Sequence, residues 1–353
     1  MPNDEQYMQR CLALAKQGEY YVAPNPMVGA VLISETGEIL SEGWHMQWGG
    51  PHAEVNCFKQ AEERGVSEDV IHSATLYVSL EPCSHFGKTP PCADLIINKM
   101  PRRVVCGMRD PNPLVAGRGI ARISEAGIEV TTGVCETECR FLNRRFLMLQ
   151  EQHRPYIILK WAQTADGYID ASRPSATGFP HAAPVAQPLL ISTPETKKIV
   201  HRMRAENMAI MVGSGTVLAD DPHLTLTHWH GRNPVRIVLD RRQRVTPDAR
   251  VRQGEDLPSD YLPDLPRTLI ISDFTDWHTL FASLADRGLH SVLVEGGATI
   301  LNSLLRANMY DELHIEVNPC LMAGGGVPAP VVPLEGMKKE QVDGNLLYSS
   351  IKS

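Results

Sequence analysis

The chain has 353 residues and a formal net charge of −7, with 43% hydrophobic and 21% charged residues. This is the composition of a globular protein too long for one ordinary hydrophobic core, so two domains are expected. The acidic balance argues against nonspecific nucleic-acid binding, and no apolar run reaches membrane-spanning length, so neither nucleic acid nor a membrane is an expected partner. Eight scattered cysteines and an acidic amino terminus predict a cytoplasmic protein without a disulfide framework.

The first part of the chain alternates helical and strand patterns. Apolar residues share one face of a helix over 4–15, and residues 27–44 predict two strands around a Thr-Gly turn. A second helix begins at His52 and ends at Gly65. The later elements are a strand over 74–80, a helix from Cys92, a strand over 102–108, a helix near 119–127 and a strand over 128–133. The series predicts an α/β layered domain ending near Phe146.

A polar segment with a proline separates this domain from a second alternating series. The boundary is expected between Leu147 and Arg154, which gives domains 1–147 and 154–353. Strands that end in Gly-rich turns before helices predict a mostly parallel sheet with a ligand at its carboxyl edge. Two Pro-rich stretches, 171–188 and 252–266, are expected to be exposed loops. The strands are expected over 156–163, 208–215, 234–240, 267–272, 290–297 and 311–318, and the helices over 193–207, 276–288 and 298–309.

Two cysteines in a stiff, turn-rich segment indicate a ligand site in the first domain. Cys83 follows a strand, and Cys92 follows Pro90 and Pro91 at the start of a helix. A strand end and a helix amino terminus can bring two thiols to one point, and the helix terminus also favours the thiolate. The two cysteines are therefore expected to meet at one site.

His52 and Glu54, at the start of an earlier helix, complete the pattern. H-x-E followed by Pro-Cys and a second cysteine is the signature of zinc-dependent deaminases, except that eight residues rather than two separate Cys83 from Cys92. One imidazole and two thiolates leave a tetrahedral Zn²⁺ one open position for an activated water, and Glu54 is expected to carry the proton. A lone histidine or cysteine is more often a core or surface residue, so only the joint pattern predicts zinc.

Longer motifs add a family resemblance. They lie at 23–31, 43–54, 76–96 and 110–120. They are similar to the bifunctional deaminase/reductase family of riboflavin biosynthesis, and the long cysteine loop distinguishes the chain from tRNA adenosine and cytidine deaminases. The resemblance implies a cytidine-deaminase-like three-layer domain that hydrolyses the 2-amino group of 2,5-diamino-6-(ribosylamino)-4(3H)-pyrimidinone 5′-phosphate. It implies substrate contacts at Asn25, His45, Lys88 and Thr89, although Asn25 is also a natural turn residue before Pro26.

The second domain lacks the G-x-G-x-x-G dinucleotide motif, but its strand at 290–297 runs through two glycines into a helix that could receive a phosphate. An ordinary tight turn explains that glycine pair equally well. Segments 159–169, 203–226 and 293–305 resemble the reductase domain of the same family, which implies a dihydrofolate-reductase-like fold that uses NADPH to reduce the ribosyl group to ribityl. The cofactor contacts implied are Gln163, Leu190, Thr216, Asp220, Gly297, Ala298 and Thr299. The substrate contacts implied are Pro188, Arg204, Leu224, Thr227 and Glu295.

Two further roles concern charged residues of this domain. Arg241, after the strand over 234–240, is placed to meet the 2′-phosphate of NADPH, with Arg242 an equal candidate and a solvated surface the alternative. Lys160 is a candidate catalytic residue that polarises the sugar as hydride arrives, with Glu295 assisting, unless this inward lysine simply pairs with a carboxylate.

Three positions depart from the family pattern. Pro188 replaces a serine, Leu190 replaces a tryptophan, and Thr227 stands where an arginine often follows. Loss of an aromatic surface and a phosphate-binding guanidinium costs on the order of 1 to 3 kcal/mol of binding each. Residues of the preceding insertion, such as Ser175 or Thr177, are candidates to replace them.

The interpretation is therefore a zinc- and NADPH-dependent enzyme that deaminates and then reduces a small pyrimidine ribosyl phosphate, and the resemblance implies a homo-oligomer. The alternatives are a zinc nucleobase or tRNA deaminase whose carboxy-terminal half binds without reducing, and a structural zinc module. The open coordination position beside Glu54 argues against the structural module.

Overall fold

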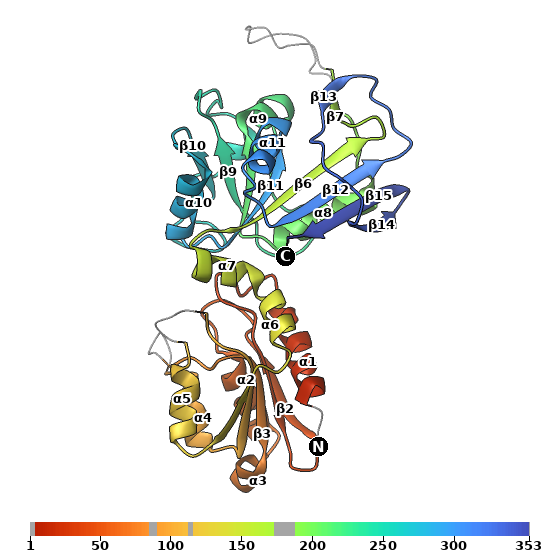
Figure 1. The fold of residues 1–353 in the computed structure, drawn as a ribbon. Coiled ribbons are helices and arrows are strands. Elements are labelled where there is room, and N and C mark those ends of the chain that lie inside the picture. The colour runs from red at the N-terminus through yellow and green to blue at the C-terminus, as the bar shows by residue number, and fades with distance from the viewer. Residues whose placement is uncertain (1–3, 85–89, 112–115, 173–187, 353) are drawn as a thin grey trace. The chain divides into compact units, whose positions relative to one another are not determined.

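The computed structural model describes residues 4–84, 90–111, 116–172 and 188–352, which form two compact units, Met1–His153 and Arg154–Ser353 (Figure 1). The predicted Lys88 and Thr89, and Ser175 and Thr177, lie outside the described residues.

The first unit is a five-stranded sheet with helices on both faces. The strand order is β2-β1-β3-β4-β5, with β1 antiparallel to β2 and β3, and β3, β4 and β5 parallel. Its strands are β1 (Gly29–Ile33), β2 (Ile39–Trp44), β3 (Thr75–Leu80), β4 (Arg103–Met108) and β5 (Glu129–Thr132). Its helices are α1 (Asp4–Ala15), the 3-10 turn η1 (Lys16–Gly18), α2 (Ala53–Glu63), α3 (Glu68–Ser73), α4 (Cys92–Lys99), α5 (Arg118–Glu125), α6 (Glu136–Leu142) and α7 (Arg144–Gln152).

Two apolar clusters make this unit three-layered. One cluster joins α2, α3, α4 and α5 to one face of the sheet, through residues such as Phe58, Ile96 and Ile123. The other joins α1, α6 and α7 to the opposite face, through Met8, Cys139 and Leu147. Alternating strand residues supply both clusters, because successive side chains point to opposite faces. The predicted three-layer α/β domain is confirmed.

The second unit has a larger, mostly parallel sheet (Figure 1). The order is β10-β9-β8-β11-β6-β12-β15-β14, parallel from β10 to β12 and antiparallel at β15 and β14. Its strands are β6 (Tyr156–Thr164), β8 (Ala209–Gly213), β9 (Val235–Leu239), β10 (Thr268–Ile271), β11 (Ser291–Gly296), β12 (Glu312–Asn318), β14 (Lys338–Val342) and β15 (Asn345–Ile351), with β7 (Tyr168–Ala171) and β13 (Gly326–Pro328) as a separate antiparallel pair. Its helices are α8 (Pro194–Ala205), α9 (Ser214–Asp220), α10 (Trp277–Asp286), α11 (Ala298–Arg306) and the 3-10 turn η2 (Arg250–Arg252).

Two expectations need correction, and one helix was not expected. Helix α7 continues through the polar segment as far as Gln152, with Leu147 buried. The strand expected over 208–215 ends at Gly213, where α9 begins. The stretch 252–266 is not wholly exposed, since Tyr261 is 2% exposed and its hydroxyl donates to two backbone carbonyls, which satisfies the buried polar group.

Candidate functional site

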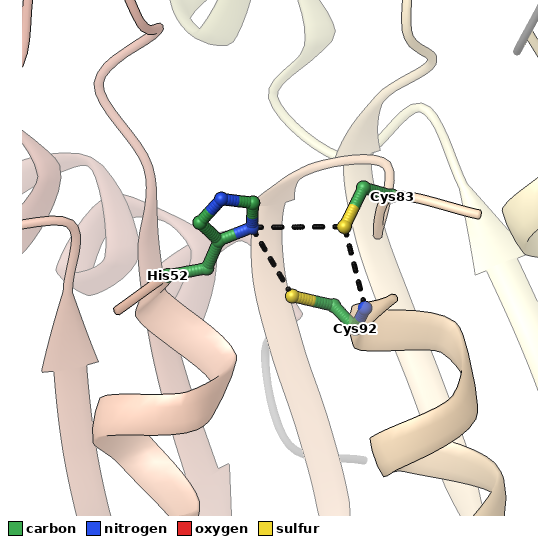
Figure 2. A group of neighbouring side chains, drawn as sticks. All are labelled: His52, Cys83 and Cys92. Atoms are coloured by element: carbon green, nitrogen blue, oxygen red, sulfur yellow. Dashed lines mark hydrogen bonds between the residues drawn. The ribbon is translucent and has the colours of Figure 1, made fainter. Parts of the chain in front are cut away.

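Three predicted ligands meet at the carboxyl end of β3 (Figure 2). His52 immediately precedes α2, Cys83 follows β3, and Cys92 is the first residue of α4. The His52 Nδ1 atom lies 3.6 Å from Cys83 Sγ and 3.3 Å from Cys92 Sγ. All three donor atoms lie within 4.8 Å of one another.

These distances fit a zinc ion. Zn–S bonds of about 2.3 Å and Zn–N bonds of about 2.0 Å place tetrahedral nitrogen and sulfur ligands about 3.5 Å apart. The backbone holds the frame, because the Cys92 N–H donates to Cys83 Sγ at 3.3 Å and the Ala93 N–H donates to the Cys83 carbonyl at 3.1 Å. The thiols are thus fixed by the strand end and the helix start, as the sequence predicted.

The electrostatics favour one thiolate, at Cys83. A hydrogen bond from Cys92, together with His52 and the Cys92 N–H, lowers the pKa of Cys83 below its ordinary value against the opposing effect of burial, and the same hydrogen bond and burial raise the pKa of Cys92. The hydrogen bond between His52 and Cys83 raises the pKa of His52. The site therefore holds negative charge next to a proton. A divalent cation that binds there displaces the proton.

Glu54 lies in the first turn of α2, beside the three donors. Its side chain is buried, the residue being 3% exposed, and burial raises its pKa while the neighbouring His52 opposes that rise. Cys92 lies within hydrogen-bonding reach of the carboxyl group. A carboxyl with a raised pKa is suited to both accepting and releasing a proton near neutral pH.

Asn25 and His45 lie together next to this centre. The Asn25 amide nitrogen is 3.0 Å from His45 Nε2, and His45 Nδ1 is 2.9 Å from the Pro51 carbonyl. That carbonyl can only accept, so His45 is protonated at Nδ1 and accepts from Asn25 at Nε2. Burial lowers the pKa of His45, whose ring packs edge-on against His52 at 5.5 Å between centroids. Of the residues predicted to contact substrate, His45 is therefore a neighbour of a predicted ligand, and Asn25 is bonded to His45.

Glu81, which sequence reasoning missed, supports the same site. It is buried two residues before Cys83, and its carboxylate accepts backbone N–H bonds from Asp110, Gly117, Gly119 and Ile120. These bonds tie the segment after β4 and the start of α5 to the strand end that presents Cys83. A glutamate directly before Pro82 and Cys83 was the available signal.

The second unit contains a cavity of about 1030 Å³ at the carboxyl edge of its sheet. Such a volume is at the upper end of small-molecule sites and suits an extended cofactor together with a substrate. The absence of a side chain at Gly213 lets Ile300 pack closely there, since a Cβ on Gly213 would meet the Ile300 side chain at 3.0 Å. The predicted residues that line the cavity are Lys160, Pro188, Leu190, Thr216, Asp220, Arg241, Glu295, Gly297, Ala298 and Thr299, together with the alternative Arg242.

Four predicted residues do not line this cavity in the described part of the chain: Gln163, Arg204, Leu224 and Thr227. Arg204 contacts a residue that does line the cavity, since its guanidinium donates to both carboxylate oxygens of Glu295 at 2.7 Å. Leu224 packs in an apolar cluster with Val217 and Val245, so its side chain serves the core. The Thr227 N–H donates to His201 Nδ1, and Gln163 accepts from the Trp161 indole.

Arginines gather where β9 ends in the cavity wall. Arg241 stacks on Phe274 with 4.2 Å between guanidinium carbon and ring centroid, and donates to the Phe274 carbonyl at 2.9 Å. Arg244, which sequence reasoning missed, donates to the Ser214 hydroxyl at 3.0 Å. Arg242 also lines the cavity. Three guanidinium groups at one end of the cavity suit a phosphate-bearing ligand.

The two halves of the chain match two known families. Residues 1–108 match the family described as cytidine and deoxycytidylate deaminase zinc-binding region, and residues 155–348 match the RibD C-terminal domain. The riboflavin biosynthesis protein RibD of Aquifex aeolicus is 38% identical, with 91% of this chain and 88% of the relative covered. That of Escherichia coli is also 38% identical, with 95% and 92% covered.

The chain belongs to the RibD family. RibD proteins are bifunctional, with a zinc-binding deaminase domain and an NADPH-dependent reductase domain, so the predicted enzyme class, fold and cofactors are confirmed. Among solved structures, the deaminase/reductase of Thermotoga maritima has a TM-score of 0.81 at 35% identity, covering 98% of this chain and 97% of its own. Acinetobacter baumannii RibD gives the same TM-score at 29% identity, covering 99% and 98%. Within the described residues of this chain, no helix has the length and apolar character needed to cross a membrane.

Proposed function

We propose that His52, Cys83 and Cys92 hold the zinc of the deaminase and that Glu54 is its proton carrier. The observation that carries this proposal is the convergence of the three donor atoms at tetrahedral spacing beside a buried carboxyl group. Zinc, when bound, lowers the pKa of a water ligand toward about 7 and so supplies the nucleophile at neutral pH.

The chain's own residues then perform the proton chemistry. Glu54 is proposed to take one proton of the attacking water and give it to the ring nitrogen, and then to take the proton of the new hydroxyl group and give it to the amine, which leaves as ammonia as the carbonyl forms. His45 packs against the ligand His52 and is bonded to Asn25, and both residues are proposed to contact the pyrimidine. Lys88 and Thr89 are proposed to contact the same substrate.

Replacement of Glu54 by glutamine tests this role. Glu54→Gln is expected to retain one zinc per chain and to lower the deamination kcat about 10²- to 10⁴-fold, because general acid–base catalysis contributes that much. Glu63→Gln, on the exposed end of the same helix, is the matched control and is expected to behave as the unmodified protein. Full ammonia release from Glu54→Gln would exclude the proposed role.

In the reductase unit we propose that the large cavity holds NADPH and the ribosyl substrate together. NADPH, when bound, supplies a hydride to C1′ of the ribosyl group, while the C1′–O4′ bond opens and O4′ takes up a proton. Lys160, whose ammonium group lines the cavity, is proposed to supply that proton. Glu295, held by Arg204, is proposed to bind the ribose hydroxyls.

The roles proposed for the rest of the cavity follow its lining. Thr216, Asp220, Gly297, Ala298 and Thr299 are proposed to contact the cofactor, with Arg241 at its 2′-phosphate. Pro188 and Leu190 line the cavity and are proposed to contact the substrate and the cofactor, respectively. Gln163, Leu224 and Thr227 are proposed to contact the ligands through their backbone, or after their side chains move when a ligand binds. Lys160→Met is expected to lower the rate of NADPH oxidation about 10²- to 10⁴-fold without altering ammonia release. Unchanged oxidation would exclude Lys160 as the proton donor.

We further infer a cytoplasmic homo-oligomer that does not bind nucleic acid. A reducing compartment keeps closely spaced thiols such as Cys83 and Cys92 available to a metal. Exposed apolar residues on the reductase unit, Val331 and Met322 among them, support self-association there. Light scattering of the purified protein tests the oligomer, and a monomer at micromolar concentration would contradict it.

A further inference from the structure

A buried carboxylate of the reductase unit has no part in the roles given so far. Glu316 lies on β12 and is 2% exposed. Its Oε2 atom accepts a hydrogen bond from the Ser192 hydroxyl at 2.6 Å, and its Oε1 atom accepts one from the Asn345 amide at 2.7 Å. The third polar neighbour is the Lys160 ammonium, whose Nζ lies 3.8 Å from Oε2.

The charges around Lys160 indicate that Glu316 is its main ionic partner. Two carboxylates attract it, Glu316 from β12 and Glu295 from β11. Arg204 already binds both oxygens of Glu295, so that charge is largely compensated. Among the described residues, the ion pair recorded for Glu316 is the one with Lys160. A carboxylate this buried is costly unless a cation and hydrogen bonds compensate it, so Glu316 and Lys160 stabilise each other.

The same cluster fixes a piece of the cavity wall. The Ile191 carbonyl accepts from the side-chain amides of Asn318 and Asn345, and Ser192 is bound to Glu316 directly. Ile191, Ser192 and Lys160 all line the cavity. One buried anion therefore holds both an ammonium group and a hydroxyl group at the surface that meets the substrate.

We infer that Glu316 is a positioning residue of the reductase, whose negative charge holds the Lys160 ammonium at the ribosyl group. This inference rests on the role proposed for Lys160. Among the hydrogen bonds and ion pairs of the described residues, neither Lys160 nor Ser192 contacts a second carboxylate. Removal of the Glu316 charge therefore frees the Lys160 side chain to turn toward solvent or toward Glu295.

Glu316→Gln separates this charge from the anchoring bonds. The glutamine oxygen can still accept from Asn345 and its amide can donate to the Ser192 hydroxyl, so the wall stays anchored while the charge is lost. The reduction kcat is expected to fall about 10- to 100-fold, the range of a coupling between neighbouring groups, with KM for NADPH within about twofold of the unmodified value. The unchanged KM for NADPH is the folding control for this unit, and Glu340→Gln on the exposed strand β14 is the matched charge control.

Two further measurements decide between a positioning and an anchoring role. In protein labelled with ¹⁵N-lysine, the Lys160 Nζ signal, assigned by its loss in Lys160→Met, is expected to be sharp in the unmodified protein and broadened by solvent exchange in Glu316→Gln. In the Lys160→Met background, Glu316→Gln is expected to cause no further loss of substrate affinity and no further loss of the remaining rate of NADPH oxidation.

The outcomes distinguish the two hypotheses. If Lys160→Met leaves reduction intact, the proposed role of Lys160 fails and this inference fails with it. If Lys160→Met lowers reduction as expected while Glu316→Gln leaves kcat and the Nζ signal unchanged, Glu316 only anchors the wall and this inference alone is overturned. An equal loss from Glu316→Gln with and without Lys160 would also overturn it.

Discussion

The deaminase centre and the reductase cavity are built in opposite ways. The three metal-ligand candidates come from one short stretch, 52–92, and are held by a strand end and two helix starts. The cavity draws its walls from 160–327, and one wall residue, Leu190, is 70% exposed. A small ion needs a few donors fixed by local backbone, whereas a dinucleotide and a sugar need a wide surface that many elements share. The two sites are therefore expected to respond separately to substitution.

The largest effect is expected at the metal centre. Cys92→Ser should lose the zinc and reduce ammonia release to the background rate, because a hydroxyl is a poor zinc ligand. Reduction of the already deaminated substrate should be unchanged. Metal analysis and the two activity assays measure this, with Cys135→Ser as a control thiol outside the site. A parallel loss of reduction would show that the sites depend on each other.

The next effect concerns the stability of the reductase unit. Arg204→Met removes the hydrogen-bonded cation of the buried Glu295 carboxylate and should lower the free energy of unfolding of this unit by about 3–5 kcal/mol. Arg202→Met, which removes the more exposed pair with Glu206, should cost less than about 1 kcal/mol. Denaturant titration compares the two variants. Equal losses in the free energy of unfolding would mean that burial of the Arg204–Glu295 pair does not determine its contribution to stability.

A smaller effect is expected at the arginine end of the cavity. Arg241→Ala should raise KM for NADPH about 10- to 100-fold, since a charge-assisted hydrogen bond contributes about 1.5–3 kcal/mol. KM for NADH, which lacks the 2′-phosphate, should not change. The same assay on Arg242→Ala shows which guanidinium has this role. Equal increases for both cofactors in Arg241→Ala would indicate loss of the Phe274 stack rather than loss of phosphate recognition.

The smallest effect is a pH dependence confined to the deaminase unit. Although burial raises the pKa of Asp4, hydrogen bonds from Arg103 and Tyr77 lower it overall below its ordinary value of 3.8. A lowered folded-state pKa stabilises the fold above the unfolded value and loses that contribution as pH falls through the folded value. Asp4→Asn should therefore flatten the acid loss of stability below about pH 4. Asp69→Asn, on exposed α3, should not.

The same contrast explains what the sequence could predict. His52, Glu54, Cys83 and Cys92 were recognisable because their chemistry requires fixed residue types at fixed local spacing. Glu316 gave no such signal, since it lies 156 positions from Lys160 and meets it only through the pairing of β12 with β6. Arg244 was missed for the same reason, because its partner Ser214 belongs to another strand end.

The fold followed a similar division. Strands with strong alternation and helices with clear stops, such as α1 and α2, were predicted closely. Helix α7 was missed because its composition is polar, and its identity depends on packing that buries Leu147. The hairpin of β14 and β15 was missed because β14 is almost wholly exposed and carries little apolar pattern.

The most direct test of the account is to follow ammonia release and NADPH oxidation together when the purified protein receives the diaminopyrimidinone ribosyl phosphate. Two working sites that act in sequence should oxidise one NADPH for each ammonia released. Cys92→Ser should then release no ammonia and should oxidise NADPH only when the deaminated substrate is supplied. Ammonia release without NADPH oxidation in the unmodified protein would contradict the account, because the reductase cavity would then bind without reducing.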